Sequence, residues 1–92
     1  MIVSIRHKAL KLLWTKDDNS KLPPDQVSKI RSILTLLHAA ETVNDVNFPG
    51  SALHPLKGDL LDYWAVTVKA NWRIIFKFEN GNAYLVDYVD YH

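Results

Sequence analysis

Several features common in other classes of protein are missing from this chain of 92 residues. It has no cysteine, which excludes a disulfide framework and a thiolate metal site. No apolar run approaches the roughly 20 residues that span a bilayer, and residues 1–6 lack the apolar stretch of a signal peptide. Hydrophobic residues make up 48% of the chain, which is enough for a folded core. We therefore expect one domain over residues 1–92, in the cytoplasm and without a membrane partner.

A strong net charge is also missing, because the formal value is only +1. The charge is nevertheless unevenly distributed along the chain. Residues 1–31 contain seven basic and three acidic side chains, a local net charge of +4, whereas the remainder has four and seven, or −3. A basic N-terminal part suits binding to a polyanion. A solvated helical face is the simpler explanation of the charge alone.

Hydrophobic periodicity predicts one strand and two helices in the first half of the chain. Residues 2–5 are short, β-branched and alternating, which is typical of a strand. Residues 7–15 have an apolar helical face. Pro23 and Pro24 are expected to open the second helix, since proline is tolerated in a first turn, and this helix fades over residues 42–44. Its buried stripe is predicted to comprise Val27, Ile30, Leu34 and Leu37, and to be widened by Ile33, Leu36 and Ala40.

The second half is predicted to be a long loop followed by three strands. Residues 47–62 contain two prolines and two glycines, which favour a loop, and loops of this length in compact domains are often functional. The strands are expected over residues 63–69, 72–78 and 83–89, with turns at Ala70-Asn71 and Asn80-Gly81. The order β-α-α-β-β-β describes an α+β domain in which an antiparallel sheet packs on two N-terminal helices.

Alternation along the middle strand assigns its side chains to two faces. Trp72, Ile74, Phe76 and Phe78 would face the helices, which leaves Arg73, Ile75 and Lys77 on an open face. The preceding strand would add Tyr63, Thr67 and Lys69 to that face. A surface with these side chains could hold single-stranded nucleic acid through phosphate contacts and base stacking.

Three segments carry side chains suited to cutting a phosphodiester. His54 and Lys57 lie in the loop, and each can also be read as an ordinary surface side chain. Arg73 could grip a phosphate with two hydrogen bonds or pair with a neighbouring aspartate. The last three residues follow a strand and supply an acid, a phenol and an imidazole that can exchange a proton near neutral pH: Asp90, Tyr91 and His92. Fraying of the chain end is the alternative for this last group.

These side chains favour cleavage without a metal ion or other cofactor. The histidines and carboxylates are scattered, with no HExxH pattern and no cysteine, so the signal for a metal site is weak. RNA supplies its own nucleophile, the 2′-hydroxyl. One protein group would deprotonate it, a second would protonate the leaving 5′-oxygen, and Lys57 with Arg73 would stabilise the crowded phosphorane.

The same three segments carry a family resemblance over nearly the whole chain. The motifs LHPLKGD at residues 53–59, NWRIIFKF at 71–78 and VDYVDYH at 86–92 resemble the HigB branch of the RelE/ParE toxins of type II toxin–antitoxin modules. The resemblance implies a RelE-like, microbial-ribonuclease-like fold and ribosome-dependent endonucleolytic cleavage of mRNA at the decoding site. The positions that it implies for the chemistry are His54, Lys57, Arg73, Asp90, Tyr91 and His92.

The resemblance also implies partners. Arg6, Lys8 and Lys11 would help dock the protein onto ribosomal RNA, with mRNA as the substrate. A helix-turn-helix HigA-like antitoxin would bind away from the active cleft, and operator DNA would be bound only through that complex. Two other hypotheses stay open on the same fold: a ParE-like gyrase inhibitor without nuclease activity, and an inactive protein that only binds an antitoxin.

Overall fold

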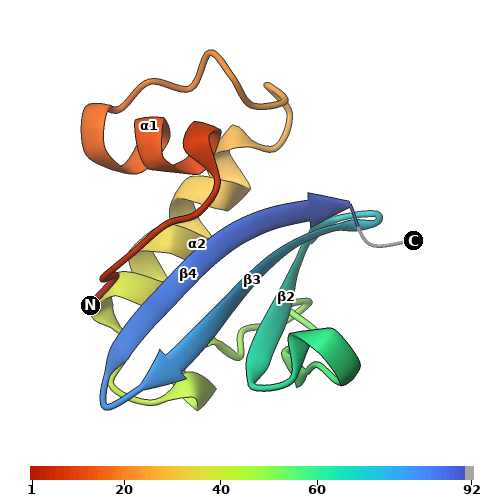
Figure 1. The fold of residues 1–92 in the computed structure, drawn as a ribbon. Coiled ribbons are helices and arrows are strands. Elements are labelled where there is room, and N and C mark those ends of the chain that lie inside the picture. The colour runs from red at the N-terminus through yellow and green to blue at the C-terminus, as the bar shows by residue number, and fades with distance from the viewer. Residues whose placement is uncertain (91–92) are drawn as a thin grey trace.

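The computed structural model describes residues 1–90, in which two helices precede a four-stranded antiparallel sheet (Figure 1). The helices are α1 (Lys8–Lys16) and α2 (Val27–Ala39), with short 3-10 helices η1 (Val43–Val46) and η2 (Gly58–Leu60). The sheet has the order β1-β2-β3-β4. Its strands are β1 (His54–Pro55), β2 (Tyr63–Lys69), β3 (Trp72–Glu79) and β4 (Asn82–Asp90). This arrangement confirms the predicted α+β class and adds the two-residue strand β1, which the sequence did not indicate.

The predicted strand over residues 2–5 is wrong as a regular strand. This segment runs along the outer edge of β4 and makes two isolated parallel bridges, Ile2 with Ala83 and Ile5 with Val86. β4 has an extra residue in its pairing with β3 at this point, where Leu85 adopts a φ of 54°. The bulge interrupts the ladder, and the Oγ atom of Ser4 accepts a hydrogen bond from the Leu85 N–H at 2.9 Å.

Both helices lie close to their predicted positions, but the start of α2 differs. Pro23 and Pro24 belong to a turn in which the Gln26 N–H donates a hydrogen bond to the Pro23 carbonyl. α2 begins only after Gln26. The prolines cannot donate within the turn, and the residue before a proline avoids helical backbone angles. No helix in residues 1–90 combines the length and the apolar content needed to cross a membrane.

The two hairpins show how turns direct side chains. Asn80 and Gly81 both have positive φ, as the predicted tight turn requires. The other hairpin contains a bulge in β2, so that Thr67 pairs with Arg73 and Lys69 with Trp72. The prediction that Lys69 shares the open face with Thr67 is therefore wrong. Its ammonium group instead forms an ion pair with Asp25 on the helix side.

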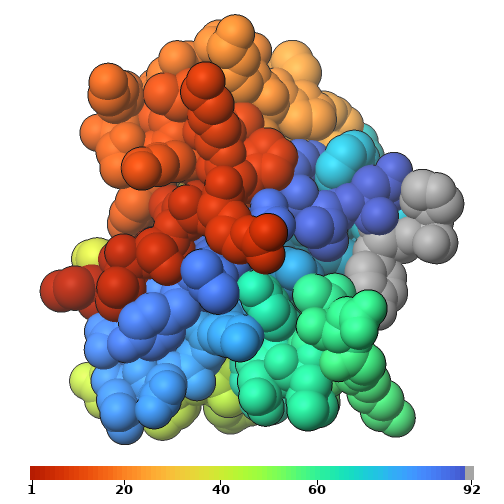
Figure 2. Space-filling view, in the orientation of Figure 1, coloured from red at the N-terminus to blue at the C-terminus, as the bar shows by residue number. Residues whose placement is uncertain are grey.

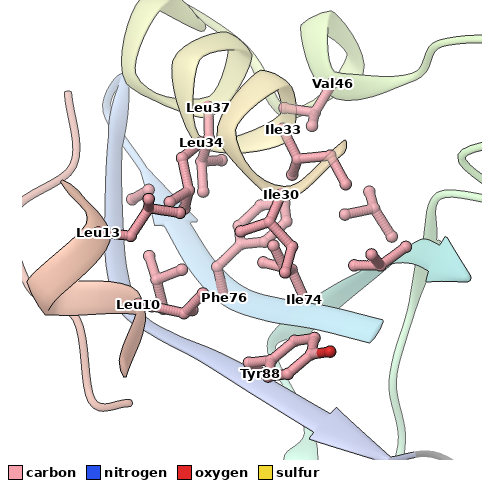
Figure 3. Packing of buried hydrophobic residues seen from close by; sticks show 14 of the residues in the cluster. Leu10, Leu13, Ile30, Ile33, Leu34, Leu37, Val46, Ile74, Phe76 and Tyr88 are labelled. Atoms are coloured by element: carbon pink, nitrogen blue, oxygen red, sulfur yellow. The ribbon is translucent and has the colours of Figure 1, made fainter. Parts of the chain in front are cut away.

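The core fills the space between the helices and one face of the sheet (Figure 3). Leu10 and Leu13 of α1 meet Ile30 and Leu34 of α2 above Ile74, Phe76 and Tyr88 of the sheet, as the labelled side chains show. These positions follow the predicted helical stripe and the predicted face of β3. The prediction that Leu36 widens the buried stripe is wrong, because this side chain is 40% exposed on the outward side of α2. The burial of this apolar face is the main stabilising contribution that the structure shows.

The opposite face of the sheet is less open than the alternation predicted. A second apolar cluster forms there around Leu56, Tyr63, Ala65 and Ile75. Tyr63 is only 6% exposed and Ile75 only 3%, because the loop before β2 lays Leu56 and Leu60 against them. Tyr63 is therefore not available as a base-stacking platform, which corrects that expectation. The loop itself is fixed to the sheet by this cluster.

The core assignment predicts different costs for two leucines in one helix. Leu34 is fully buried and Leu36 is 40% exposed. We expect Leu34→Ala to lower the free energy of unfolding by about 2–5 kcal/mol and Leu36→Ala by less than about 1 kcal/mol. Urea unfolding followed by circular dichroism measures both, and equal losses would contradict the packing of α2.

Candidate functional site

The sheet register places His54 and Arg73 on the same face, the one opposite the helices. His54 pairs with Ala65, Ala65 with Ile75, and Ile75 with Asp87, so these four residues form one row across all four strands. Arg73 lies in the adjacent row, between Thr67 and Val89. Because directly paired residues share a face, the alternation predicted for Arg73 is confirmed. Two strand spacings of about 4.8 Å separate the backbones of β1 and β3, a span of about 10 Å.

His54 has a defined tautomer. Its Nδ1 atom lies 2.7 Å from the carbonyl oxygen of Ala52, which can only accept a hydrogen bond. Nδ1 therefore carries the proton when the ring is neutral, and Nε2 keeps its lone pair. Ala52 adopts a φ of 49°, in the left-handed region of backbone angles. A half-buried imidazole held in this way presents Nε2 as a proton acceptor.

Arg73 is held by main-chain carbonyls at the β2–β3 turn. Its Nη1 donates hydrogen bonds to the carbonyl oxygens of Ala70 and Trp72, the latter at 3.1 Å. The ion pairs of residues 1–90 join Arg31 to Asp17 and Lys69 to Asp25, and Arg73 takes part in neither. These two acceptors are neutral main-chain carbonyls, and they orient a guanidinium that is positively charged and therefore suited to an anionic ligand.

Lys57 belongs to the same loop as His54. It is exposed at the position before η2, three residues beyond His54, and the intervening Leu56 is anchored in the second apolar cluster. The main chain of this loop is also tied to β2, because Ser51 accepts a 2.7 Å hydrogen bond from the Thr67 N–H through its carbonyl. The cation and the imidazole therefore extend from a fixed segment.

Asp90 lies on the other side of the sheet from Arg73 and His54. It pairs with Trp72, whose ring packs against the helix-covered core. Its charge, together with that of Asp25, helps raise the pKa of the Tyr88 hydroxyl, for which burial is the main cause. Asp90 thus borders the core face at the end of β4. Tyr91 and His92, the other two predicted residues of this group, lie outside the described residues.

The three basic residues expected to contact ribosomal RNA are all exposed. Arg6 follows the edge segment beside β4, and its N–H donates to the Val86 carbonyl at 2.8 Å. Lys8 and Lys11 extend from the outer face of α1. Their charges are therefore accessible on the N-terminal side of the molecule, which is visible in red and orange in Figure 2.

One hollow of the described surface is lined by none of His54, Lys57, Arg73 and Asp90. It has a volume of about 750 Å³ and lies over Lys77, with Leu56 and Leu61 on one side and Tyr84 and Leu85 on the other. In Figure 2 the green residues near position 60 and the blue residues of β4 flank it. Within residues 1–90, no group of three His, Asp or Glu side chains is placed to hold a metal ion.

The comparison with known proteins identifies the family. The model for the HigB toxin, a RelE-like toxin of type II toxin–antitoxin systems, matches residues 3–92. The chain belongs to the HigB-like toxin family. A curated relative, "Endoribonuclease HigB" of Proteus vulgaris, is 47% identical over 92 residues, which cover all of both chains.

Solved structures place the HigB-like chain in a wider fold group. YafQ from E. coli strain BL21(DE3) superposes with a TM-score of 0.67 at 18% identity, covering 98% of this chain and 91% of that one. YoeB in the YoeB-YefM complex from Staphylococcus aureus gives 0.63 at 17% identity, with coverage of 100% and 95%. At these identities the likeness concerns the fold alone, and it agrees with the RelE-like architecture expected from the motifs.

The hydrogen bonds of the histidine rings predict different tautomers. Nδ1 of His54 faces a carbonyl, whereas Nδ1 of His7 accepts from the Ala9 N–H at 3.2 Å and Nδ1 of His38 from the Ile2 N–H at 3.1 Å. At a pH where the rings are neutral, long-range ¹H–¹⁵N spectra should show the Nδ1–H form for His54 and the Nε2–H form for the other two. An Nε2–H form for His54 would remove its assignment as a proton acceptor at Nε2.

Proposed function

We propose that this HigB-like toxin is a ribosome-dependent endoribonuclease that cleaves mRNA at the decoding site in the cytoplasm and thereby inhibits translation. The single observation that carries the proposal is the placement of the His54 imidazole and the Arg73 guanidinium on one face of the sheet. The name of the Proteus vulgaris relative, an endoribonuclease 47% identical over the full length, supports the same activity.

The proposed reaction uses the 2′-hydroxyl of the RNA as nucleophile and needs no metal ion. Nε2 of His54, which keeps its lone pair, removes the 2′-hydroxyl proton. The 2′-oxygen attacks the phosphorus, and the negative charge of the phosphorane is stabilised by Arg73 and Lys57. His92 donates a proton to the leaving 5′-oxygen. The products are a 2′,3′-cyclic phosphate and a 5′-hydroxyl, so one proton is removed and one is returned.

The remaining predicted residues have supporting roles in this proposal. Asp90 orients the histidine that donates the proton, and Tyr91 stacks on a base or assists the proton transfer. Arg6, Lys8 and Lys11 are exposed on the N-terminal side and contact ribosomal RNA through its phosphates. With a net charge of only +1, the toxin depends on the ribosome to present the mRNA.

The proposed protein partner is a HigA-like helix-turn-helix antitoxin. Membership of a toxin–antitoxin family supports an antitoxin partner, and one structural neighbour was solved as a YoeB-YefM complex. We propose that the antitoxin binds away from His54 and Arg73, and that the complex contacts operator DNA through the antitoxin alone.

Cleavage in a purified translation system tests the nuclease proposal. Primer extension on a reporter mRNA should show cuts only when ribosomes are present. We expect His54→Ala to lower the cleavage rate by about 10²–10⁴-fold, the range for lost acid–base catalysis. Arg73→Ala should cost about 10²–10³-fold, the range for removing a group that stabilises developing charge.

Two controls separate the chemistry from folding. Arg31→Ala removes an exposed arginine of α2 that pairs with Asp17, and its cleavage rate should stay within about twofold of wild type. An mRNA with a 2′-deoxynucleotide before the scissile phosphate should resist cutting. If the wild-type protein cuts no mRNA with or without ribosomes but inhibits gyrase supercoiling, the nuclease proposal is wrong and the ParE-like alternative is supported.

A further inference from the structure

Tyr88 occupies an unusual position behind the candidate site. It lies two residues before the end of β4, on the helix-covered face, and its side chain is only 6% exposed (Figure 3). Its hydroxyl donates a hydrogen bond to the Oε1 atom of Gln26, and Gln26 is also only 6% exposed. Apart from two tyrosines, Gln26 and Ser51 are the buried polar side chains of residues 1–90. A buried polar pair is costly to break when one partner is left unsatisfied.

The Tyr88 ring also connects two other elements. It stacks on the Trp72 ring with centroids 4.6 Å apart and an angle of 13° between the planes. The His7 ring, at the start of α1, meets its edge at 5.5 Å and 84°. Such aromatic pairs add to stability beyond the burial of their area. The three rings therefore join β3, β4 and α1 at one end of the sheet.

A second contact binds the same end of the sheet to the segment before α2. Lys69, which pairs with Trp72 at the β2–β3 turn, forms an ion pair with Asp25. The hydrogen bond from Lys69 lowers the pKa of the Asp25 carboxyl, so the carboxylate stays charged at cellular pH. Adjacent residues 25 and 26 thus hold β2 and β4 respectively. Both side chains are exposed, so this ion pair adds little stability by itself.

Trp72 connects these contacts on the helix-covered side to Arg73 on the open face. Its carbonyl accepts a hydrogen bond from the Arg73 guanidinium at 3.1 Å, and the other acceptor is the Ala70 carbonyl in the same turn. The direction of the guanidinium therefore depends on the backbone of Trp72 and Ala70. On the helix-covered side, the Trp72 ring stacks on the Tyr88 ring, and this contact holds the backbone of the turn. The hydrogen bond to Gln26 holds Tyr88 in turn.

We infer that Tyr88 and Gln26 are positioning residues for the cleavage reaction, acting through Trp72 on the guanidinium of Arg73. This inference rests on the proposed nuclease function. Neither residue reaches the RNA, because both lie on the helix-covered side of the sheet. Their contribution is to hold the phosphate-binding group in one direction, so that the phosphorane meets it without further rearrangement.

The phenol also keeps its donor hydrogen over a wide pH range. Burial and the charges of Asp25 and Asp90 raise the pKa of the Tyr88 hydroxyl. The neutral phenol is therefore favoured in the folded protein, and its hydrogen bond to Gln26 is retained until the pH rises through that raised pKa. Bracing by this hydrogen bond should not change between slightly acidic and slightly alkaline solutions.

Tyr88→Leu and Phe78→Leu form a matched pair for testing the inference. Both remove a ring from the helix side of the sheet, but Phe78 lies at the opposite end of β3 and meets Phe76 edge-on at 6.4 Å. With ribosomes in excess, Tyr88→Leu should lower the maximal single-turnover cleavage rate by about tenfold or more, since a misplacement of about 1 Å can cost about a hundredfold. The half-saturating ribosome concentration should change by less than about twofold.

The control and a conservative variant complete the design. Phe78→Leu should lose comparable stability in urea but keep its maximal rate within about twofold. Tyr88→Phe retains the stack on Trp72, so its rate should lie between those of wild type and Tyr88→Leu. Equal rate losses in Tyr88→Leu and Phe78→Leu would overturn the inference, as would a change confined to the half-saturating concentration. If Tyr88→Leu does not fold, the double variant that combines Tyr88→Phe with Gln26→Leu takes its place. A wild-type cleavage rate in that double variant would overturn the inference.

A spectroscopic measurement separates this inference from the nuclease proposal. The Arg73 Nε–H resonance of the free protein should shift or broaden in Tyr88→Leu and stay at its wild-type position in Phe78→Leu. If Tyr88→Leu shows this shift but the wild-type protein fails to cut mRNA, the nuclease proposal is wrong. The dependence of the Arg73 guanidinium on Tyr88 would still be supported. An unchanged resonance in Tyr88→Leu would show that the guanidinium does not depend on the stack.

Discussion

The burial of one face of β3 against α2 determines where the functional groups of this protein can lie. Ile74 and Phe76 are fully buried against the helices, so the residues that alternate with them, Arg73 and Ile75, must point to the other side of the sheet. A slip of one residue in β3 would exchange the two faces and bury a guanidinium. The same contact that stabilises the fold thus places Arg73 where an anionic ligand can reach it.

The open face is divided into two regions with different character. The second apolar cluster, built on Leu56 and Ile75, covers its middle and fixes the loop that carries His54 and Lys57. On one side of this cluster, Arg73 is oriented by main-chain carbonyls. On the other side, the large hollow over Lys77 contains neither His54 nor Arg73. The chemistry proposed for the HigB-like toxin therefore belongs to the region around the β2–β3 turn, and not to the hollow over Lys77.

Hydrophobic periodicity predicted the helices and strands. The points at which the structure differs from the prediction depend on contacts between distant residues, which no local sequence pattern encodes. The stripe of α2, the faces of β3 and the Asn80-Gly81 turn followed from spacing and turn chemistry. The bulge in β2 that directs Lys69 toward Asp25 depends on long-range pairing, as does the bulge that reduces residues 2–5 to two bridges. His54, Lys57 and Arg73 were proposed from their motifs, and their roles in cleavage stay predictions. Tyr88 and Gln26 were not proposed, because their hydrogen bond spans 62 positions.

We propose that the open sheet face around Arg73 receives the mRNA. A structure of the toxin trapped on a ribosome with a 2′-O-methyl mRNA tests it most directly, because that substrate cannot supply the nucleophile. The scissile phosphate is expected to lie against Arg73 and Lys57, with Nε2 of His54 directed at the 2′-oxygen. An mRNA that contacts another surface and leaves this face empty would contradict it.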